Sequence, residues 1–224
     1  MRHENKFVYE KHYYHDIIDK IMISPFFFRE IYHERKVNNI YLDTHLLSNY
    51  HDNVSGIQNR TKHRIRWYGE GTRVASPILE YKIKNGRLGY KKHFHFPPFV
   101  MDKSFNYHRY KKKIKDGLDT DHSEYALMVD EISMEIPTLH NTYRRRYFLS
   151  GDGKYRLTID TDLTFSSMSE THHRSFGFTQ ESIVVELKYE NEDIEGAAAI
   201  LQSLGLRLST NSKYVTGITG LYYS

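Results

Sequence analysis

The sequence contains no cysteine. Disulfide bonds, thiolate metal sites and cysteine nucleophiles are therefore all excluded. A chain without disulfides is compatible with the reducing cytoplasm, and we predict a cytoplasmic location.

Long apolar segments are also missing. The longest candidate, Ile23–Phe28, is far shorter than the roughly 20 residues that a membrane helix needs. The opening residues MRHENKFVYEKHYY are polar and lack the apolar core of a signal peptide. We therefore expect a soluble chain without a transmembrane segment.

Several short catalytic motifs are absent as well. A nucleotide-cradling glycine-rich loop, a G-x-S-x-G elbow and an H-E-x-x-H helix do not occur, so P-loop, α/β-hydrolase and zincin chemistry lack support. Histidine is plentiful, but neither His93/His95 nor His172-His173 has a carboxylate at a spacing typical of metal sites. Surface or core roles are favoured for these histidines.

The composition is that of a globular, sheet-rich protein. Of the 224 residues 39% are hydrophobic and 27% charged, which argues against disorder. Tyrosine and phenylalanine are abundant while only 5 prolines occur, and this favours β-structure. Lys and Arg exceed Asp and Glu by only 32 to 28, so net charge alone argues weakly for an anionic partner. Without a repeat or linker, residues 1–224 are predicted to form a single domain.

The hydrophobic pattern predicts eight strands and three helices. Asn85-Gly86 and Gly151-Asp152-Gly153 are typical of hairpin turns, and Gly205 of a helix end. Residues 100–136 are the hardest to interpret, with an exposed basic stretch expected at Lys111–Lys113. The predicted strands cover residues 2–9, 37–43, 60–68, 79–84, 88–96, 143–148, 155–165 and 182–189, and the predicted helices residues 11–23, 125–134 and 193–204.

The segment RTKHRIRWY (residues 60–68) has an unusual distribution of charge. Side chains of a strand alternate between its faces, so Arg60, Lys62, Arg64 and Arg66 point the same way. At about 3.3 Å per residue these cations form a row roughly 20 Å long. Ile65 and Trp67, on the other side, are suited to packing.

Other predicted strands repeat this pattern, with charge on one face and bulk on the other. Such strands predict an α+β fold in which a sheet curves around a charged interior, closes into a barrel and is covered on its outside by helices. The polar faces are Arg2/Glu4/Lys6, Glu80/Lys82/Lys84, Arg156/Thr158/Asp160 and Glu186/Lys188.

So many inward cations require a counter-charge, because burial of unpaired charge is costly. A linear polyphosphate or nucleoside triphosphate offers charges in line and acceptor oxygens for arginine. For one strand alone, a solvated face with cross-strand ion pairs is the simpler interpretation. Repetition of this charge pattern on several strands favours a bound ligand instead. The carboxylates are hard oxygen ligands that suit Mg²⁺ or Mn²⁺, and they are Glu4, Glu80, Asp160 and Glu186.

Eight segments, in order, resemble the catalytic domain of the vacuolar transporter chaperone (VTC) family. This family is the polyphosphate polymerase branch of the triphosphate tunnel metalloenzymes, which are related to CYTH domains. The segments are R-x-E-x-K-F at 2–7, IYLDT at 40–44, RTKHRIRWY at 60–68, LEYKIK at 79–84, YRRRYF at 143–148, YRLTIDTDL at 155–163, VVELKY at 184–189 and SKYVTGI at 212–218.

The resemblance implies an antiparallel barrel that encloses a tunnel, ATP-dependent polyphosphate synthesis, and a divalent metal, Mn²⁺ or Mg²⁺. Glu186 would be the metal ligand, with Glu4 and Glu80 as further candidates. Within Arg144-Arg145-Arg146, alternation with Tyr143 selects Arg145 as the inward residue. The catalytic cations would be Arg64, Arg66, Lys82, Arg145, Arg156 and Lys213, and further phosphate-binding residues would be Lys6, Arg60, Lys62, Lys84 and Lys188.

Two departures from the family pattern matter. Arg2 replaces the first glutamate of the superfamily signature E-x-E-x-K, which favours a polymerase over a simple triphosphatase. The chain also carries no SPX domain and no membrane helices, so we expect a stand-alone catalytic domain. The partners expected are ATP and polyphosphate, whereas nucleic acid is not expected. The alternatives are a metal-dependent tripolyphosphatase or nucleoside triphosphatase, and a polyphosphate-binding module without turnover.

Overall fold

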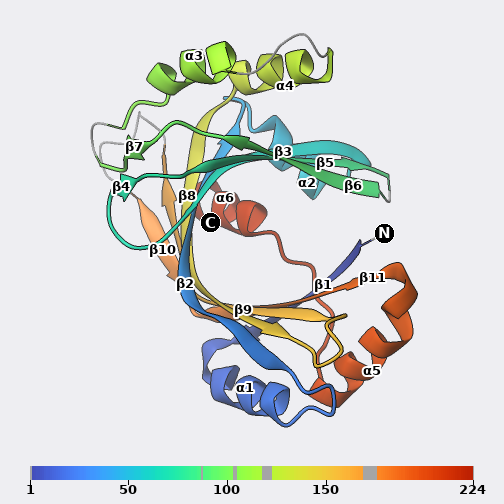
Figure 1. Cartoon of the computed structure of the whole chain (residues 1–224). Helices are drawn as coiled ribbons and strands as arrows, with labels where there is room; N and C mark the ends of the chain where they lie inside the picture. Colours follow the sequence, from blue (N-terminus) through green and yellow to red (C-terminus); the bar gives the residue numbers. More distant parts are fainter. Residues whose placement is uncertain (1, 87, 103–104, 118–122, 169–175, 224) are drawn as a thin grey trace. The chain divides into compact units, whose positions relative to one another are not determined.

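Most strands of the protein join one antiparallel sheet. A computed structural model describes residues 2–86, 88–102, 105–117, 123–168 and 176–223 (Figure 1). The strand order is β1-β11-β9-β8-β2-β3-β5-β6, with β10 beside β9, and β4 pairs with β7 in a second small sheet. The strands are β1 Arg2–Glu10, β2 Arg29–Asp43, β3 Asn59–Tyr68, β4 Arg73–Val74, β5 Ile78–Asn85, β6 Leu88–His95, β7 Phe99–Val100, β8 Ile136–Leu149, β9 Arg156–Ser167, β10 Gly177–Gln180 and β11 Ser182–Glu190.

The helices are short and lie between the strands in sequence. None of the described helices is both long and apolar enough to cross a membrane. They are α1 Tyr14–Met22, α2 Ser48–Val54, α3 His108–Gly117, α4 Ser123–Met134, α5 Ile194–Leu204 and α6 Lys213–Tyr222, with short 3₁₀ turns at Lys11–Tyr13 and Asn191–Asp193.

The chain divides into two compact units, each assembled from three segments. Unit 1 consists of Met1–Lys36, Thr142–Thr164 and Thr179–Lys213. Unit 2 consists of Val37–Asn141, Phe165–Phe178 and Tyr214–Ser224.

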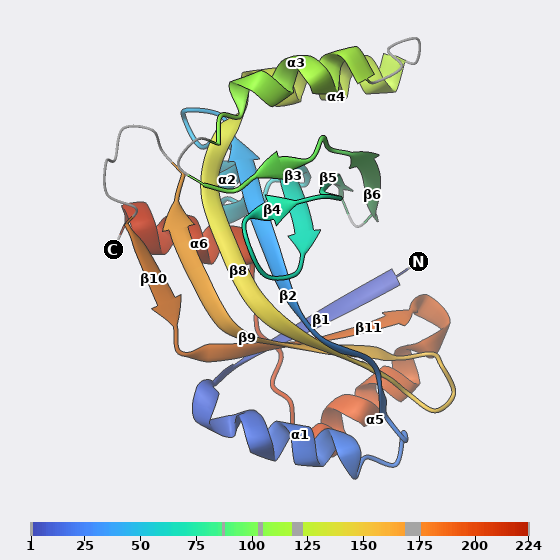
Figure 2. The same ribbon diagram turned by 60° about the vertical axis from the view of Figure 1, so that its left-hand side comes forward.

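In unit 1, helices α1 and α5 cover one face of strands β1, β9 and β11 (Figure 2). Alternation along these strands places apolar side chains on that face, and Ile17 and Ile21 of α1 pack against them. Gly205, with φ of 63°, ends α5 in the left-handed conformation that glycine favours. The buried strand residues are Phe7, Leu157, Ile159, Ile183, Val185 and Leu187.

In unit 2, the core lies behind β3 and β5, on the side that faces α3 and α4 (Figure 2). Ile65 and Trp67 of β3 are buried there, as the alternation predicted. The predicted Asn85-Gly86 turn joins β5 to β6, and Gly86 has a φ of 58°. Leu79 and Tyr81 of β5 and Met128 and Ile132 of α4 complete this layer.

The predicted α+β fold with an antiparallel sheet is confirmed, whereas closure of the barrel stays a prediction. Three local expectations were incomplete. Helix α3 occupies the region expected to be an exposed basic stretch, where half-buried Lys111 donates to the Ser133 carbonyl over 2.7 Å. Helix α6 begins at Lys213, in a segment for which no helix was predicted. Strand β2 begins at Arg29 and not at residue 37 as predicted. Its first part is polar and exposed, so the hydrophobic pattern detected only the apolar part that follows.

Candidate functional site

Strands β3, β5 and β6 direct a set of charged side chains to one side of unit 2, which we call the basic face of unit 2. Residues directly opposite each other in an antiparallel pair share a side of the sheet. The cross-strand rows on this face are Arg60–Lys84, Lys62–Lys82–Lys91 and Arg64–Glu80–His93.

The middle row of this face brings like charges together. Lys62, Lys82 and Lys91 face one another on three adjacent strands. Like charges directly opposite each other destabilise a sheet. The register therefore creates a strip of positive charge that an anion lying across the strands would stabilise.

Glu80 is the carboxylate in the cross-strand rows of the basic face of unit 2, and its side chain is only 7% exposed. Its oxygens accept from Arg64 Nε at 2.6 Å and from Arg66 Nη1 at 3.4 Å. Lys91 Nζ and His93 Nε2 lie 3.6 and 3.7 Å away. Burial opposes ionisation, but Arg64, Arg66 and Lys91 outweigh it and lower the pKa of Glu80 to about 2. Glu80 is therefore an ionised anchor for the surrounding cations.

Strand β2 supplies two neutral partners that the sequence did not reveal as site residues. Asn39 Oδ1 accepts from Arg66 Nε at 2.9 Å, and Tyr41 Oη accepts from Arg64 Nη1 at 3.3 Å. Both lie opposite their arginine in the β2–β3 register. Asp43 of the same strand is buried and accepts from the backbone N–H groups of Asn49 and Tyr50 at the start of α2.

The corresponding basic face of unit 1 lies on β1, β11 and β9 and carries charges of both signs. Lys6 Nζ lies 2.8 Å from Glu4, and Lys188 contacts Glu186. Burial opposes ionisation of Glu186, yet Lys188, Arg145 and Lys6 hold its pKa well below the usual range. The cross-strand rows are Glu4–Lys188–Arg156, Lys6–Glu186–Thr158 and Val8–Val184–Asp160.

Asp160 is fully buried and holds two predicted site cations of unit 1. Arg145 of β8 donates to it from Nε at 2.5 Å and from Nη2 at 2.7 Å, and Lys213 Nζ lies 2.6 Å away. The Tyr143 ring lies 5.1 Å from the Arg145 guanidinium carbon and 4.7 Å from Lys213 Nζ. Burial alone would raise the pKa of Asp160, but the opposite effect of Arg145 and Lys213 is larger. The pKa is therefore lowered and the carboxylate stays ionised.

The directions predicted from alternation hold within the arginine triple. Arg145 is buried, whereas Arg144 is exposed and lies 3.4 Å from Glu34, and Arg146 donates to Glu30 over 2.9 Å. Arg156 and Lys82 share the predicted faces but are exposed.

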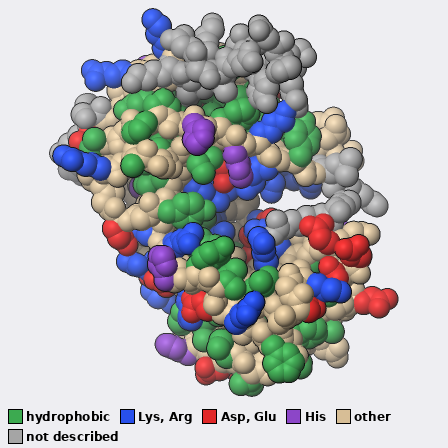
Figure 3. All heavy atoms as spheres, viewed as in Figure 1, with side chains coloured by type: hydrophobic (Ala, Val, Ile, Leu, Met, Phe, Trp, Pro, Cys, Tyr) green, Lys and Arg blue, Asp and Glu red, His purple; other side chains and the backbone are tan. Residues whose placement is uncertain are grey.

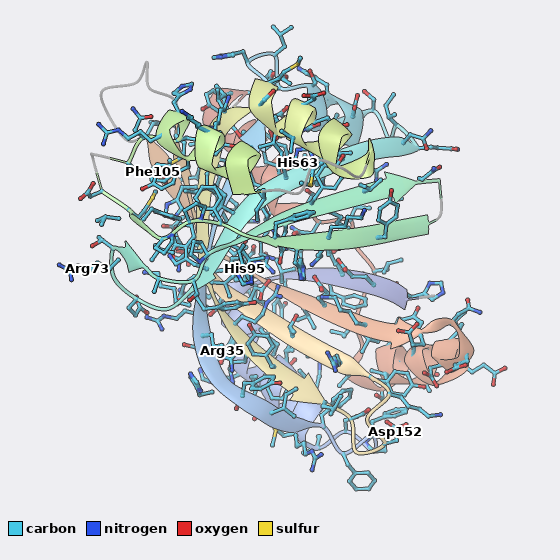
Figure 4. All side chains as sticks on the ribbon, turned by 45° about the horizontal axis from the view of Figure 1, so that its top comes forward. Arg35, His63, Arg73, His95, Phe105 and Asp152 are labelled. Atoms are coloured by element: carbon cyan, nitrogen blue, oxygen red, sulfur yellow. The ribbon has the colours of Figure 1, made fainter. Side chains whose placement is uncertain are left out.

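The opposite side of β3 contains a buried polar pair that sequence reasoning missed. His63 is fully buried, and its Nδ1 lies 2.7 Å from Glu135, which directly follows α4. Asn49 Nδ2 donates to the same carboxylate over 2.6 Å, and Tyr81 stacks on the imidazole. Figure 4 shows His63 beside the helices of this unit. The pair ties α4 to β3, behind the predicted phosphate-binding residues.

The described residues contain no group of three or more His, Asp or Glu side chains placed to hold a metal ion alone. Histidines on the visible face are scattered among other side chains (Figure 3). Glu4, Glu80 and Glu186 all bear hard oxygen donors, and each already contacts at least one cation. They fit an ion such as Mg²⁺, which binds one or two carboxylates together with substrate phosphates.

The fold is that of the CYTH, or triphosphate tunnel, proteins. A solved structure of HpAC1 from Hippeastrum, a putative adenylyl cyclase described as having a dominant triphosphatase activity, superposes with a TM-score of 0.54. It is 16% identical, and the match covers 98% of this chain and 96% of that chain. A conserved hypothetical protein from Pyrococcus furiosus has a TM-score of 0.50 and 12% identity, over 97% of this chain and 100% of that chain.

The chain belongs to the VTC domain family, whose model matches residues 1–222. The match confirms the resemblance found in the strand motifs and runs through both units. No curated protein matches the chain significantly.

Proposed function

We propose that this VTC domain is a polyphosphate polymerase that transfers the γ-phosphoryl group of ATP to a growing polyphosphate chain. The observation that carries the proposal is the facing row Lys62–Lys82–Lys91. It lies on a face where seven Lys and Arg residues accompany Glu80. A linear polyanion matches such a surface, because its charges repeat along a line and its oxygens accept from many donors. Membership of the VTC family supports the same substrate class.

In the proposed reaction the residues act through charge and position. A terminal oxygen of the polyphosphate attacks the γ-phosphorus in line, the bond to the β–γ bridging oxygen breaks, and ADP leaves. A protein nucleophile is not required. Cations near the transferring group stabilise the developing charge, and the proposed residues for this role are Arg64, Arg66, Lys82, Arg145, Arg156 and Lys213. The proposed holders of the remaining phosphates are Lys6, Arg60, Lys62, Lys84 and Lys188.

A divalent cation would neutralise phosphate charge when bound. We propose Glu186 as its ligand, with Glu4 on the same face of unit 1 as the next candidate. Glu80 remains a third candidate, although two arginines already occupy its oxygens. The predicted cytoplasmic location fits this proposal, because ATP is present there.

Two observations favour a second candidate function, a metal-dependent triphosphatase. Glu4 retains one acidic residue of the superfamily signature. The fold is also shared with a protein described as having a dominant triphosphatase activity. In this reaction water replaces the polyphosphate end as the nucleophile, and the same cations hold the substrate.

Incubation with ATP and Mn²⁺, followed by gel analysis for polymer and assays for ADP and orthophosphate, separates the possibilities. We expect long polymer with ADP in matching amounts, and we expect EDTA to stop both. Orthophosphate without polymer would indicate the triphosphatase. Polyphosphate binding that releases no ADP and survives Glu186→Ala would indicate a binding module.

A further inference from the structure

The carboxylate of Asp160 is occupied by protein groups on both of its oxygens. Oδ1 accepts from Arg145 Nε at 2.5 Å, and Oδ2 accepts from Arg145 Nη2 at 2.7 Å and from Lys213 Nζ at 2.6 Å. The side chain is fully buried. This geometry is that of a bidentate arginine fork completed by an ammonium group.

The two cations retain donors for another anion. An arginine side chain has five N–H donors and a lysine has three. Among the described residues, two N–H groups of Arg145 and one of Lys213 donate to the Asp160 carboxylate. The shared carboxylate therefore fixes both cationic heads while leaving N–H groups for a phosphate.

The Tyr143 ring supports the same arrangement. It lies 5.1 Å from the Arg145 guanidinium carbon and 4.7 Å from Lys213 Nζ, so an aromatic ring flanks both cations. Side chains as long as Arg and Lys lose considerable rotamer freedom when a ligand orders them. Asp160 and Tyr143 impose that order before the ligand arrives.

We propose that Asp160 is a positioning residue that presets Arg145 and Lys213 for phosphate, and that it is not a metal ligand. The inference rests on the proposed function only in that these two cations bind a substrate phosphate. It assigns the carboxylates of this face to two tasks. Asp160 organises cations, whereas Glu186 and Glu4 provide oxygens to a metal.

A double-mutant cycle in the affinity for inorganic tripolyphosphate tests the proposal. Binding is measured by calorimetry in EDTA, so neither polymerisation nor metal is needed. We expect Lys213→Met to weaken binding at least tenfold in the wild-type background. In the Asp160→Asn background, where the ammonium is no longer held, the same substitution should cost less than threefold. A purely structural role for Asp160 would leave the two costs equal, and equal costs would overturn the proposal.

Lys6→Met is the matched control, because Lys6 Nζ lies 2.8 Å from Glu4 on β1 and donates to the Asn211 carbonyl, whereas Lys213 Nζ lies 2.6 Å from Asp160. Its cost should be the same in both backgrounds. Asp160→Glu supplies a second cycle that keeps the buried charge, so the test survives if Asp160→Asn does not fold. Additivity in that cycle would equally refute the positioning role.

Mn²⁺ binding in the presence of tripolyphosphate, followed by electron paramagnetic resonance, separates positioning from ligation. Glu186→Gln should weaken Mn²⁺ binding at least tenfold, whereas Asp160→Asn should change it less than twofold. A large loss of Mn²⁺ affinity on Asp160→Asn would overturn the assignment. Absence of polymer in the ATP assay would reject the proposed polymerase without affecting either result.

Discussion

The two basic faces hold their cations in different ways. On the unit 1 face Glu4 lies opposite Lys188 and Lys6 opposite Glu186, and Asp160 contacts Arg145 and Lys213. On the unit 2 face seven Lys and Arg residues accompany Glu80, and three lysines face one another. Carboxylates thus face the cations directly in unit 1, whereas in unit 2 the middle row of the face consists of lysines alone.

This difference suggests different responses to substitution. A cation of unit 1 that is bound to a buried carboxylate is already ordered, and its loss leaves that carboxylate buried without its counter-charge. A lysine of the Lys62–Lys82–Lys91 row instead faces like charges, so its loss removes attraction for an anion but also reduces repulsion between the lysines. Substrate should therefore stabilise unit 2 more than unit 1.

The largest expected effect is at Arg66, which is buried against Asn39 and Glu80. Arg66→Glu places two buried carboxylates together and removes a phosphate-binding cation. We expect ATP turnover to fall at least about 1000-fold, the lower end of the roughly 10³–10⁵ that an arginine at the transferring phosphoryl group contributes to turnover. Turnover is measured as ADP release in ATP and Mn²⁺.

Arg144→Glu is the control, because Arg144 is exposed on the other side of its strand. Its turnover should stay within about twofold of wild type, the range expected for an exposed charge. Normal polyphosphate extension by the Arg66→Glu protein would remove the unit 2 face from the site. Arg66→Met, which avoids the added carboxylate, provides a milder variant if folding fails.

An intermediate effect is expected in the pH dependence of stability. The pKa of Glu80 is lowered from 4.5 to about 2 in the folded protein, so its ionised form contributes about 3 kcal/mol to the free energy of unfolding. Because the folded pKa is depressed, this contribution is present above about pH 4.5 and is lost as the pH falls toward 2. Urea denaturation between pH 6 and 2 measures it.

Glu80→Gln should remove this part of the pH dependence, while Glu192→Gln at an exposed site should not. Addition of tripolyphosphate should restore more stability to Glu80→Gln than to wild type, because the ligand replaces the missing negative charge. An unchanged pH profile for Glu80→Gln would show that Glu80 does not stabilise the surrounding cations.

The smallest effect is expected at Lys84, an exposed cation of the unit 2 face. Lys84→Ala should raise KM for ATP about threefold with little change in kcat, since exposed charges contribute roughly 1 kcal/mol or less. The effect should fade at high salt because of screening. Lys92→Ala, on the other side of β6, should change neither constant. A rise in KM on Lys84→Ala that stays the same at every salt concentration would argue against a simple electrostatic role.

Local patterns predicted a large part of this fold. Alternation in RTKHRIRWY correctly separated Arg64 and Arg66 from the core residues Ile65 and Trp67, and the Asn85-Gly86 turn was placed correctly. Helix α3 was missed because three consecutive lysines obscure its apolar positions. Lys91 was missed because no residue near it in sequence marks it as part of a site.

The sequence by itself determined which side chains share a face of each strand, since that depends only on the two-residue repeat of the backbone. It also determined the family, through motifs that recur in order. The two predicted turns also joined β5 to β6 and β8 to β9, whereas tertiary structure alone decided the other strand neighbours and the register. That register brought Lys62, Lys82 and Lys91 into one row and Asp160 between Arg145 and Lys213. These charges come together only when the strands pair in this register, which alternation along a single strand does not specify.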